Sequence, residues 1–187
     1  MKKSLLLIAI TTTFLAGCTT VTEKIAKISP FKSSMTQNVA LKTSFNPDDA
    51  AYILTDGTAT ISGSSAVIDA SGEKITCAGN NVYLVPVNDY SHERYQYLFG
   101  NATKGFSPDS VIQKVRFTPD NPEFRKYMRV STCTYTGEFS FENVPEGQYY
   151  IGTNIISELD GYNTIEGGAY AKEITIKPGQ SLKIELN

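Results

Sequence analysis

The only histidine of the chain lies among residues that could do acid–base chemistry. His92 stands in "DYSHER", with Asp89, Ser91 and Glu93 within three positions of it. A serine, a histidine and a carboxylate are the groups of a nucleophilic hydrolase, but in such enzymes separate segments bring them together in space. The chain also lacks G-x-S-x-G, the turn that exposes a nucleophilic serine. We therefore predict no catalytic residue and interpret the segment as a polar loop or helix start, with a hydrolase using His92 as the alternative.

Aromatic residues and an arginine cluster around that histidine and could bind a ligand. The candidate binding surface consists of Tyr90, Arg94, Tyr95 and Tyr97. Tyrosine and arginine are enriched at the residues that dominate binding energy. Together with Phe99, the same rings could instead seal the edge of a core, because aromatic side chains most often serve cores. We favour the packing role and keep the binding role open.

One of the three cysteines directly follows an apolar segment at the start of the chain. Lys2 and Lys3 precede an apolar run over residues 5–16, which leads to "LAGC" ending at Cys18. A basic start followed by a short apolar run is typical of a secretory signal, whereas a spanning helix needs about 20 apolar residues. "LAGC" resembles the bacterial lipobox, which implies cleavage before Cys18 and a lipid anchor (diacylglycerol and an acyl chain such as palmitate) on that residue. Because Thr19 stands where an Asp would retain lipoproteins of didermal bacteria at the inner membrane, the resemblance implies the outer membrane. We expect a lipid-anchored protein of the bacterial cell envelope, facing the periplasm or the cell surface.

The other two cysteines remain as a pair. Cys77 and Cys133 would close a loop of 57 residues, counting both ends, which stabilises a fold by about 4 kcal/mol in the chain-entropy model. In an oxidising compartment a disulfide is the expected state of such a pair. Two buried thiols or a metal site are the alternatives, but zinc would need two further ligands and His92 is the only histidine. We predict the disulfide and neither a metal nor a cofactor.

Composition limits the class of protein and of partner. Without residues 1–17, 170 residues remain, enough for one domain of ordinary size. The formal net charge of −2 becomes −4 when the two lysines of the signal are removed, and no basic tract is present. We therefore do not expect nucleic acid as a partner. Eleven tyrosines and nine phenylalanines without a tryptophan suit a β-rich core or a binding surface.

Short strands separated by turns must position these residues. "GEFSFENV" alternates, with Phe139 and Phe141 on one face and polar residues on the other. Apolar or alternating segments of strand length also occur at 57–69, 81–87 and 148–156, and at 172–186, where a Pro-Gly turn predicts a terminal hairpin. Only "SHERYQYLFG" shows a possible helical period.

The chain divides into three parts by character. Residues 1–17 form the signal peptide, and residues 18–47, rich in Ser, Thr and Lys, are expected to be a flexible linker, with a short amphipathic helix at 21–28 as the alternative. Residues 48–187 form the domain. Within it, 88–128 is a long aromatic-rich insertion, and loops of that length are usually functional unless they are disordered.

The string "YTGEFSFENVPEGQYYIG" resembles the carboxypeptidase regulatory-like family. The matching positions are Gly137, Phe139, Phe141, Val144, Pro145, Gly147 and Tyr149. The resemblance implies an all-β, seven-stranded Greek-key sandwich of the prealbumin or immunoglobulin-like kind, without a catalytic role. The 88–128 insertion, between the second and third strands, is a departure from that pattern.

These observations lead to two functional hypotheses. The first is a non-enzymatic envelope lipoprotein whose β-sandwich binds an unknown envelope protein or glycan. The alternative is an envelope hydrolase or a peptidase-accessory protein.

Overall fold

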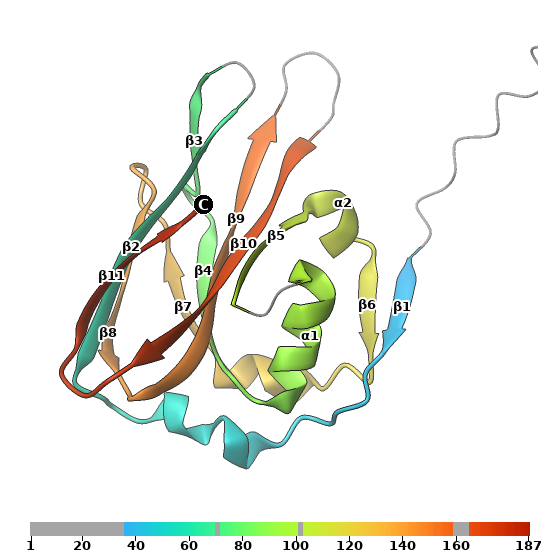
Figure 1. The fold of residues 1–187 in the computed structure, drawn as a ribbon, viewed down its shortest axis with the longest axis vertical. Coiled ribbons are helices and arrows are strands. Elements are labelled where there is room, and N and C mark those ends of the chain that lie inside the picture. Colours follow the sequence, from blue (N-terminus) through green and yellow to red (C-terminus); the bar gives the residue numbers. More distant parts are fainter. Residues whose placement is uncertain (1–35, 70–71, 101–102, 159–164) are drawn as a thin grey trace, which may run out of the picture. The chain divides into compact units, whose positions relative to one another are not determined.

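The computed structural model of the chain describes residues 36–69, 72–100, 103–158 and 165–187 (Figure 1). The predicted signal peptide, the lipid anchor at Cys18 and the linker up to residue 35 lie outside the described residues. A compact unit begins at Thr36 and extends to Asn187.

Strands make up most of the described secondary structure, which confirms the all-β class. Eleven strands are present in the described ranges, and the predicted count of seven was wrong. They are β1 (Gln37–Ala40), β2 (Ala59–Ile68), β3 (Lys74–Thr76), β4 (Asn81–Pro86), β5 (Lys104–Pro108), β6 (Val115–Thr118), β7 (Arg129–Thr132), β8 (Glu138–Val144), β9 (Gly147–Glu158), β10 (Ile165–Ile176) and β11 (Ser181–Leu186). The helices are α1 (Asp89–Phe99) and α2 (Asp109–Ile112), with 3-10 turns η1 (Pro47–Asp49), η2 (Ala51–Leu54) and η3 (Pro122–Tyr127). None of these helices is long and apolar enough to cross a membrane.

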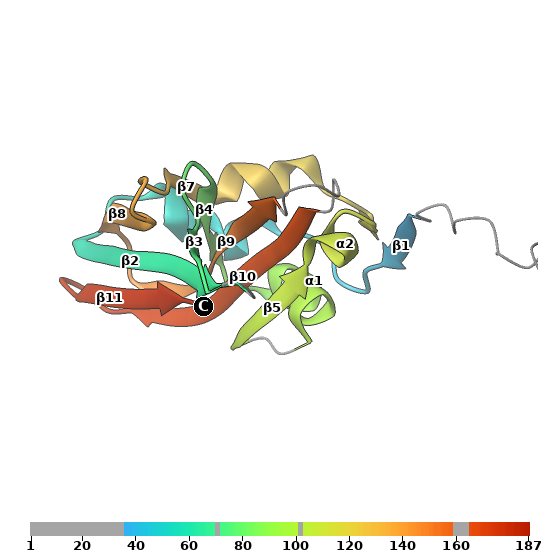
Figure 2. The same cartoon turned by 90° about the horizontal axis from the view of Figure 1, so that it is seen from above.

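Two sheets face each other and enclose the main core. One has five strands in the order β5-β10-β9-β4-β7, and the other has β11-β2-β3 with β8 also paired to β2. Residues from both sheets form one buried cluster, including Ile61, Phe141 and Ile184 from the smaller sheet and Leu84 and Ile151 from the larger one. Figure 2 shows α1 and α2 on the far side of β9 and β10 from β2 and β11. The outer face of the larger sheet is therefore the one that carries the helices.

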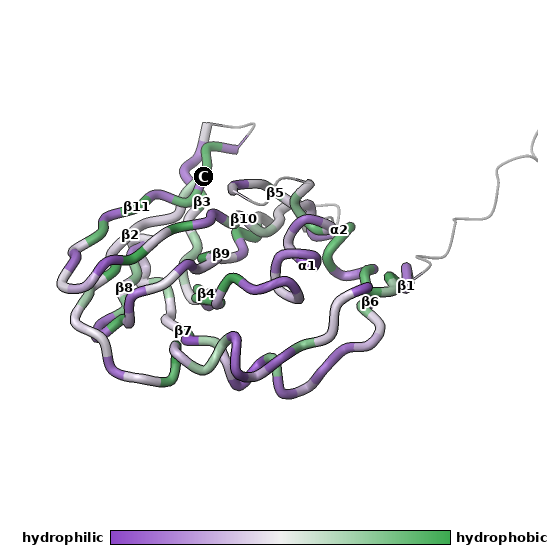
Figure 3. Tube along the Cα trace, turned by 60° about the horizontal axis from the view of Figure 1, so that its bottom comes forward, coloured by the Kyte–Doolittle hydropathy of each residue, from purple (hydrophilic) through white to green (hydrophobic). Residues whose placement is uncertain are grey.

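The alternation in β8 places its side chains as predicted. Phe139 and Phe141 are each 5% exposed, whereas Glu138 and Ser140 are exposed. A residue at every second position faces the same side of a strand, so the pattern reports burial directly. Figure 3 shows the same alternation of hydrophobic and hydrophilic residues along β11.

Gly147, at the start of β9, allows the ring of Tyr52 to approach the backbone closely. A Cβ atom at position 147 would lie 2.4 Å from that ring.

The predicted terminal hairpin was wrong. A turn with Gly179 at φ +68° does follow β10, but the two flanking strands belong to different sheets. β10 pairs antiparallel with β9, and β11 pairs parallel with β2. The Pro-Gly turn thus carries the chain from one layer of the sandwich to the other.

The predicted 88–128 insertion is folded and extends the sandwich. It contains α1, β5, α2, β6 and η3, and β5 adds an edge strand beside β10. The possible helical period near residue 91 is confirmed by α1.

The segment before residue 48 also folds: β1 pairs in parallel with β6, and Phe45 is buried at 7% exposure. The predicted domain boundary at residue 48 therefore lies too late, because residues 36–47 pack on the insertion.

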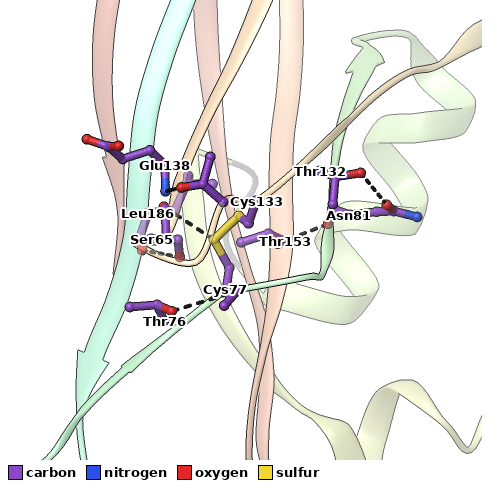
Figure 4. Close-up of a disulfide and its surroundings, with 12 residues drawn as sticks. Ser65, Thr76, Cys77, Asn81, Thr132, Cys133, Glu138, Thr153 and Leu186 are labelled. Carbon is purple, nitrogen blue, oxygen red and sulfur yellow. Dashed lines mark hydrogen bonds between the residues drawn. A yellow bond between two sulfur atoms is a disulfide. The ribbon is translucent and has the colours of Figure 1, made fainter.

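The predicted disulfide between Cys77 and Cys133 is confirmed (Figure 4). Both cysteines are buried, and their Cα atoms are 5.8 Å apart. Backbone hydrogen bonds join the same two segments, since Gly79 N donates to Cys133 O at 3.1 Å and Cys133 N donates to Asn80 O at 2.9 Å. The bridge fixes the end of β7 at the point where the chain leaves the larger sheet for β8.

Candidate ligand-binding site

Local capping explains why α1 begins where it does. The Asn88 side chain accepts a hydrogen bond from Ser91 N at 2.9 Å, and Ser91 Oγ accepts one from Asn88 N at 3.0 Å. This reciprocal capping box satisfies backbone donors that a helix start leaves free. The Ser91 hydroxyl also donates to Pro86 O at 2.7 Å. It is fully buried, and its hydrogen bonds serve to start the helix.

The other polar groups of "DYSHER" face different partners. His92 Nδ1 lies 2.8 Å from the Tyr150 hydroxyl, and burial raises the pKa of that hydroxyl to about 12. The Glu93 carboxylate accepts hydrogen bonds from the backbone of Lys42 and Thr43 at 2.9–3.0 Å. The geometry therefore assembles no serine–histidine–carboxylate array from this segment.

Of the predicted binding surface, Tyr90 belongs to a second aromatic core, and Arg94 packs on aromatic rings beside it. Tyr90 is 1% exposed, and its ring lies 5.1 Å from Phe124 and 5.7 Å from Phe45. The Arg94 side chain is 16% exposed, and its guanidinium carbon lies 4.3 Å from the centre of the Phe117 ring. Tyr90 thus packs the insertion onto the residues before β2, as the packing interpretation expected.

Of the other two residues of that surface, Tyr95 packs against the same core, whereas Tyr97 is exposed. Tyr95 stacks on Tyr150 of β9, with ring centres 4.1 Å apart, and burial raises the pKa of the Tyr95 hydroxyl above its usual range. Tyr97 is 40% exposed and meets Phe117 edge to face at 5.9 Å. The four predicted residues therefore lie along one helix but do not form one surface.

A groove of about 510 Å³ lies on the outer face of the five-stranded sheet. Its floor comes from β9 and β10, where Gly152 is paired with Ala171 and Asn154 with Ala169. These four residues share the face of the sheet that carries Tyr150, opposite the main core. Three of them have a small side chain or none, which leaves space above the strands. Asn154 adds an amide that can both donate and accept hydrogen bonds.

Aromatic and apolar residues form the walls of this groove. Tyr83 of β4 and Val130 of β7 are paired across the sheet and are 41% and 54% exposed. Arg94 and Tyr95 of the predicted surface line the groove, whereas Tyr90 and Tyr97 are not among its lining residues. The remaining walls come from α1, α2 and the region of η3, with Leu98, Phe99, Ile112, Phe124, Arg125 and Met128.

Two arginines meet at one end of the groove. Arg94 of α1 and Arg125 of η3 both bind Asp120, at 3.0 and 2.9 Å. Burial opposes ionisation of Asp120, but the hydrogen bonds from the two guanidinium groups outweigh it and hold the pKa of that carboxyl below its usual value. None of the described residues that line the groove is acidic.

The arrangement suits noncovalent binding. Ligand sites are concave and mostly apolar, with a few polar groups that orient the ligand, and this groove combines exposed rings with an amide and two arginines. Within the described residues, no three His, Cys, Asp or Glu side chains are placed to hold a metal ion. Tyr83 and Asn154 were not predicted as site residues. Tyr83 could have been found, because in "NVYLVPV" the alternation places it on the face opposite Val82 and Leu84.

The described residues form a β-sandwich domain with a groove on the outer face of its larger sheet. Among solved structures, the chain is similar to that of a proposed carbohydrate-binding protein of Pseudomonas aeruginosa. The TM-score is 0.59 and the sequence identity 26%, over 77% of this chain and 97% of that chain. No protein-family model and no curated protein sequence matches the chain. The resemblance to the carboxypeptidase regulatory-like family therefore stays a prediction.

Proposed function

We propose that the chain is a non-enzymatic lipoprotein of the bacterial envelope whose β-sandwich binds a glycan in the groove on the larger sheet. The N-terminal lipid on Cys18 holds it at the outer membrane. The hydrolase alternative has no assembled group of side chains to support it, because Ser91, His92 and Glu93 serve different partners.

The observation that carries the binding proposal is the exposed ring of Tyr83 beside a floor of small residues. The C–H faces of a sugar ring pack on aromatic rings, and tyrosine offers a rigid apolar body with a polar tip. The floor at Gly152, Ala169 and Ala171 leaves space for such a ring, and Asn154 can bond to its hydroxyls. The similarity to a proposed carbohydrate-binding protein supports a glycan over a protein partner.

Glycan binding is tested with the purified full-length protein on an array of bacterial and other oligosaccharides, followed by calorimetry with the strongest binder. We expect Tyr83→Ala to weaken that binding by about tenfold or more, because it removes the exposed aromatic ring from the wall of the groove. Tyr135→Ala is the matched control, since Tyr135 is 98% exposed and does not line the groove. If no saccharide binds, or if the two variants bind equally, the proposal fails.

A further inference from the structure

The charge of the groove is uneven, and its positive end lies where α1 meets η3. Arg94 and Arg125 converge there on Asp120. Two guanidinium groups against one carboxylate leave an excess of one positive charge, and no described lining residue is acidic. Arginine keeps its charge at any physiological pH, so this excess is permanent.

The two arginines differ in how far they can reach a ligand. The Arg94 side chain is 16% exposed, and its guanidinium carbon lies 4.3 Å from the centre of the Phe117 ring and 5.1 Å from that of Phe124. Its position is fixed by this packing. The Arg125 side chain is 65% exposed and lines the groove. Arg125 is therefore the group that can bond to a ligand, and Arg94 is a positioning residue that holds Asp120.

We propose that the groove selects an acidic saccharide, whose carboxylate binds Arg125 while its ring lies on the small-residue floor beside Tyr83. A planar guanidinium presents several donors in a fork that matches a carboxylate, and such charge-assisted bonds are about twice as strong as neutral ones. This inference rests on the proposed function, since it names the class of glycan that the same groove takes.

The test uses matched probes that differ only in charge. Hyaluronan and galacturonan oligosaccharides are titrated into the full-length protein, alongside the same oligosaccharides after reduction of their carboxyl groups to alcohols. A hexaglutamate peptide is the third probe. We expect an acidic oligosaccharide to bind at least about tenfold more tightly than its reduced form. Its affinity should fall as salt is raised from 50 to 500 mM, because added ions screen charge pairs.

Neighbouring variants separate a specific contact from overall charge. Arg125→Gln should weaken binding of the acidic probe by about tenfold and remove the preference over its reduced form. Lys126→Gln is the matched control: Lys126 is on the same 3-10 turn, is similarly exposed at 69%, and pairs with Glu123 at 3.1 Å, but it does not line the groove. This variant should bind as the unchanged protein does.

The possible outcomes distinguish this inference from the proposed function. Equal binding of acidic and reduced probes, lost in Tyr83→Ala but not in Arg125→Gln, overturns the acidic preference and leaves glycan binding in place. Binding of neither form overturns the inference, and the oligosaccharide array then decides the proposed function separately. Binding of hexaglutamate alone would show an acidic peptide as the partner and overturn both.

Discussion

At the scale of single residues, the binding proposal depends on Tyr83, an aromatic ring left exposed on a strand whose neighbours are buried. Val82 and Leu84 on either side are fully buried and face the main core. Period-2 alternation in the sequence is enough to place Tyr83 on the other face. The floor could not be predicted in the same way, because Ala169 and Ala171 are small residues without distinctive chemistry. They form the floor of a groove only because β10 lies beside β9 in the folded sheet.

The alternation in β8 predicts the effect of single substitutions on stability. Phe141→Ala should lower the free energy of unfolding by about 3–5 kcal/mol, because it leaves a cavity between the two sheets. Ser140→Ala is the control on the exposed face and should change stability by less than about 0.5 kcal/mol. Urea unfolding curves of both variants measure the difference. Similar losses at the two positions would contradict the assignment of the inner and outer faces.

At the scale of elements, α1 both lines the groove and holds the segment that leads toward the N-terminus. Glu93 is the contact: its carboxylate accepts hydrogen bonds from Lys42 N at 2.9 Å, and from Thr43 N and Oγ1 at 3.0 and 2.7 Å. The backbone N–H of Lys42, and next the hydroxyl of Thr43, lower the pKa of Glu93 below its usual value near 4.5. The hydrogen bonds that Glu93 accepts from residues 42 and 43 are therefore strongest while its carboxylate is ionised, whereas Phe45 is held separately by its packing on Tyr90.

We expect Glu93→Ala to loosen the backbone at residues 42 and 43 without unfolding the sandwich. The amides of Lys42 and Thr43 should lose protection from hydrogen exchange at neutral pH, whereas Gln96→Ala, an exposed position on the same helix, should leave them protected. The unchanged protein should behave like the variant in acid. Because the folded-state pKa of Glu93 is depressed, its contribution to stability is present above the unfolded-state pKa and is lost as pH falls through the folded-state pKa. Protection that persists in Glu93→Ala would show that other contacts hold the segment.

The pairing of strands was harder to predict than the strands themselves. Alternation identified the two faces of 172–186 correctly, since Ile174, Ile176, Ile184 and Leu186 are all buried. It could not identify their partner strands. A two-residue period shows which face of a strand is buried, but it does not show which strand lies alongside. A Pro-Gly turn between two such strands is equally suited to a hairpin and to a crossing between layers.

At the scale of the whole molecule, the domain has a second core outside the sandwich. It contains Phe45, Val85, Tyr90, Phe124 and Tyr150, which come from the residues before β2, from the larger sheet and from the insertion. No local pattern in the sequence links these segments, which explains why 18–47 was predicted to be a linker and 88–128 an irregular insertion. The aromatic content of the insertion was the signal for packing, and it identified the role of Tyr90 though not its partners.

The proposed anchor can be tested on the intact protein. Cys18→Ser should abolish partitioning into the detergent phase and leave a soluble or uncleaved product, because the thiol is the site of lipid attachment. Two or more acyl chains hold a protein stably at a membrane, so the unchanged protein should stay in that phase. Substituting the neighbouring Thr19 by Ser is the control and should have no effect. Equal partitioning of Cys18→Ser and the unchanged protein would contradict the lipoprotein proposal.

The parallel pairing of β11 with β2 has a consequence for the order in which the chain can fold. Residues 181–186 lie beside residues 60–65, so the smaller sheet joins segments separated by 121 positions. A chain that emerges N-terminus first, from a ribosome or through a translocation pore, presents β2 long before β11 exists. Because such distant contacts slow folding, we expect the smaller sheet to stay incomplete until residues 181–186 have emerged. An open polypeptide is the form that can pass through a narrow pore, and this topology delays closure until β11 has been delivered.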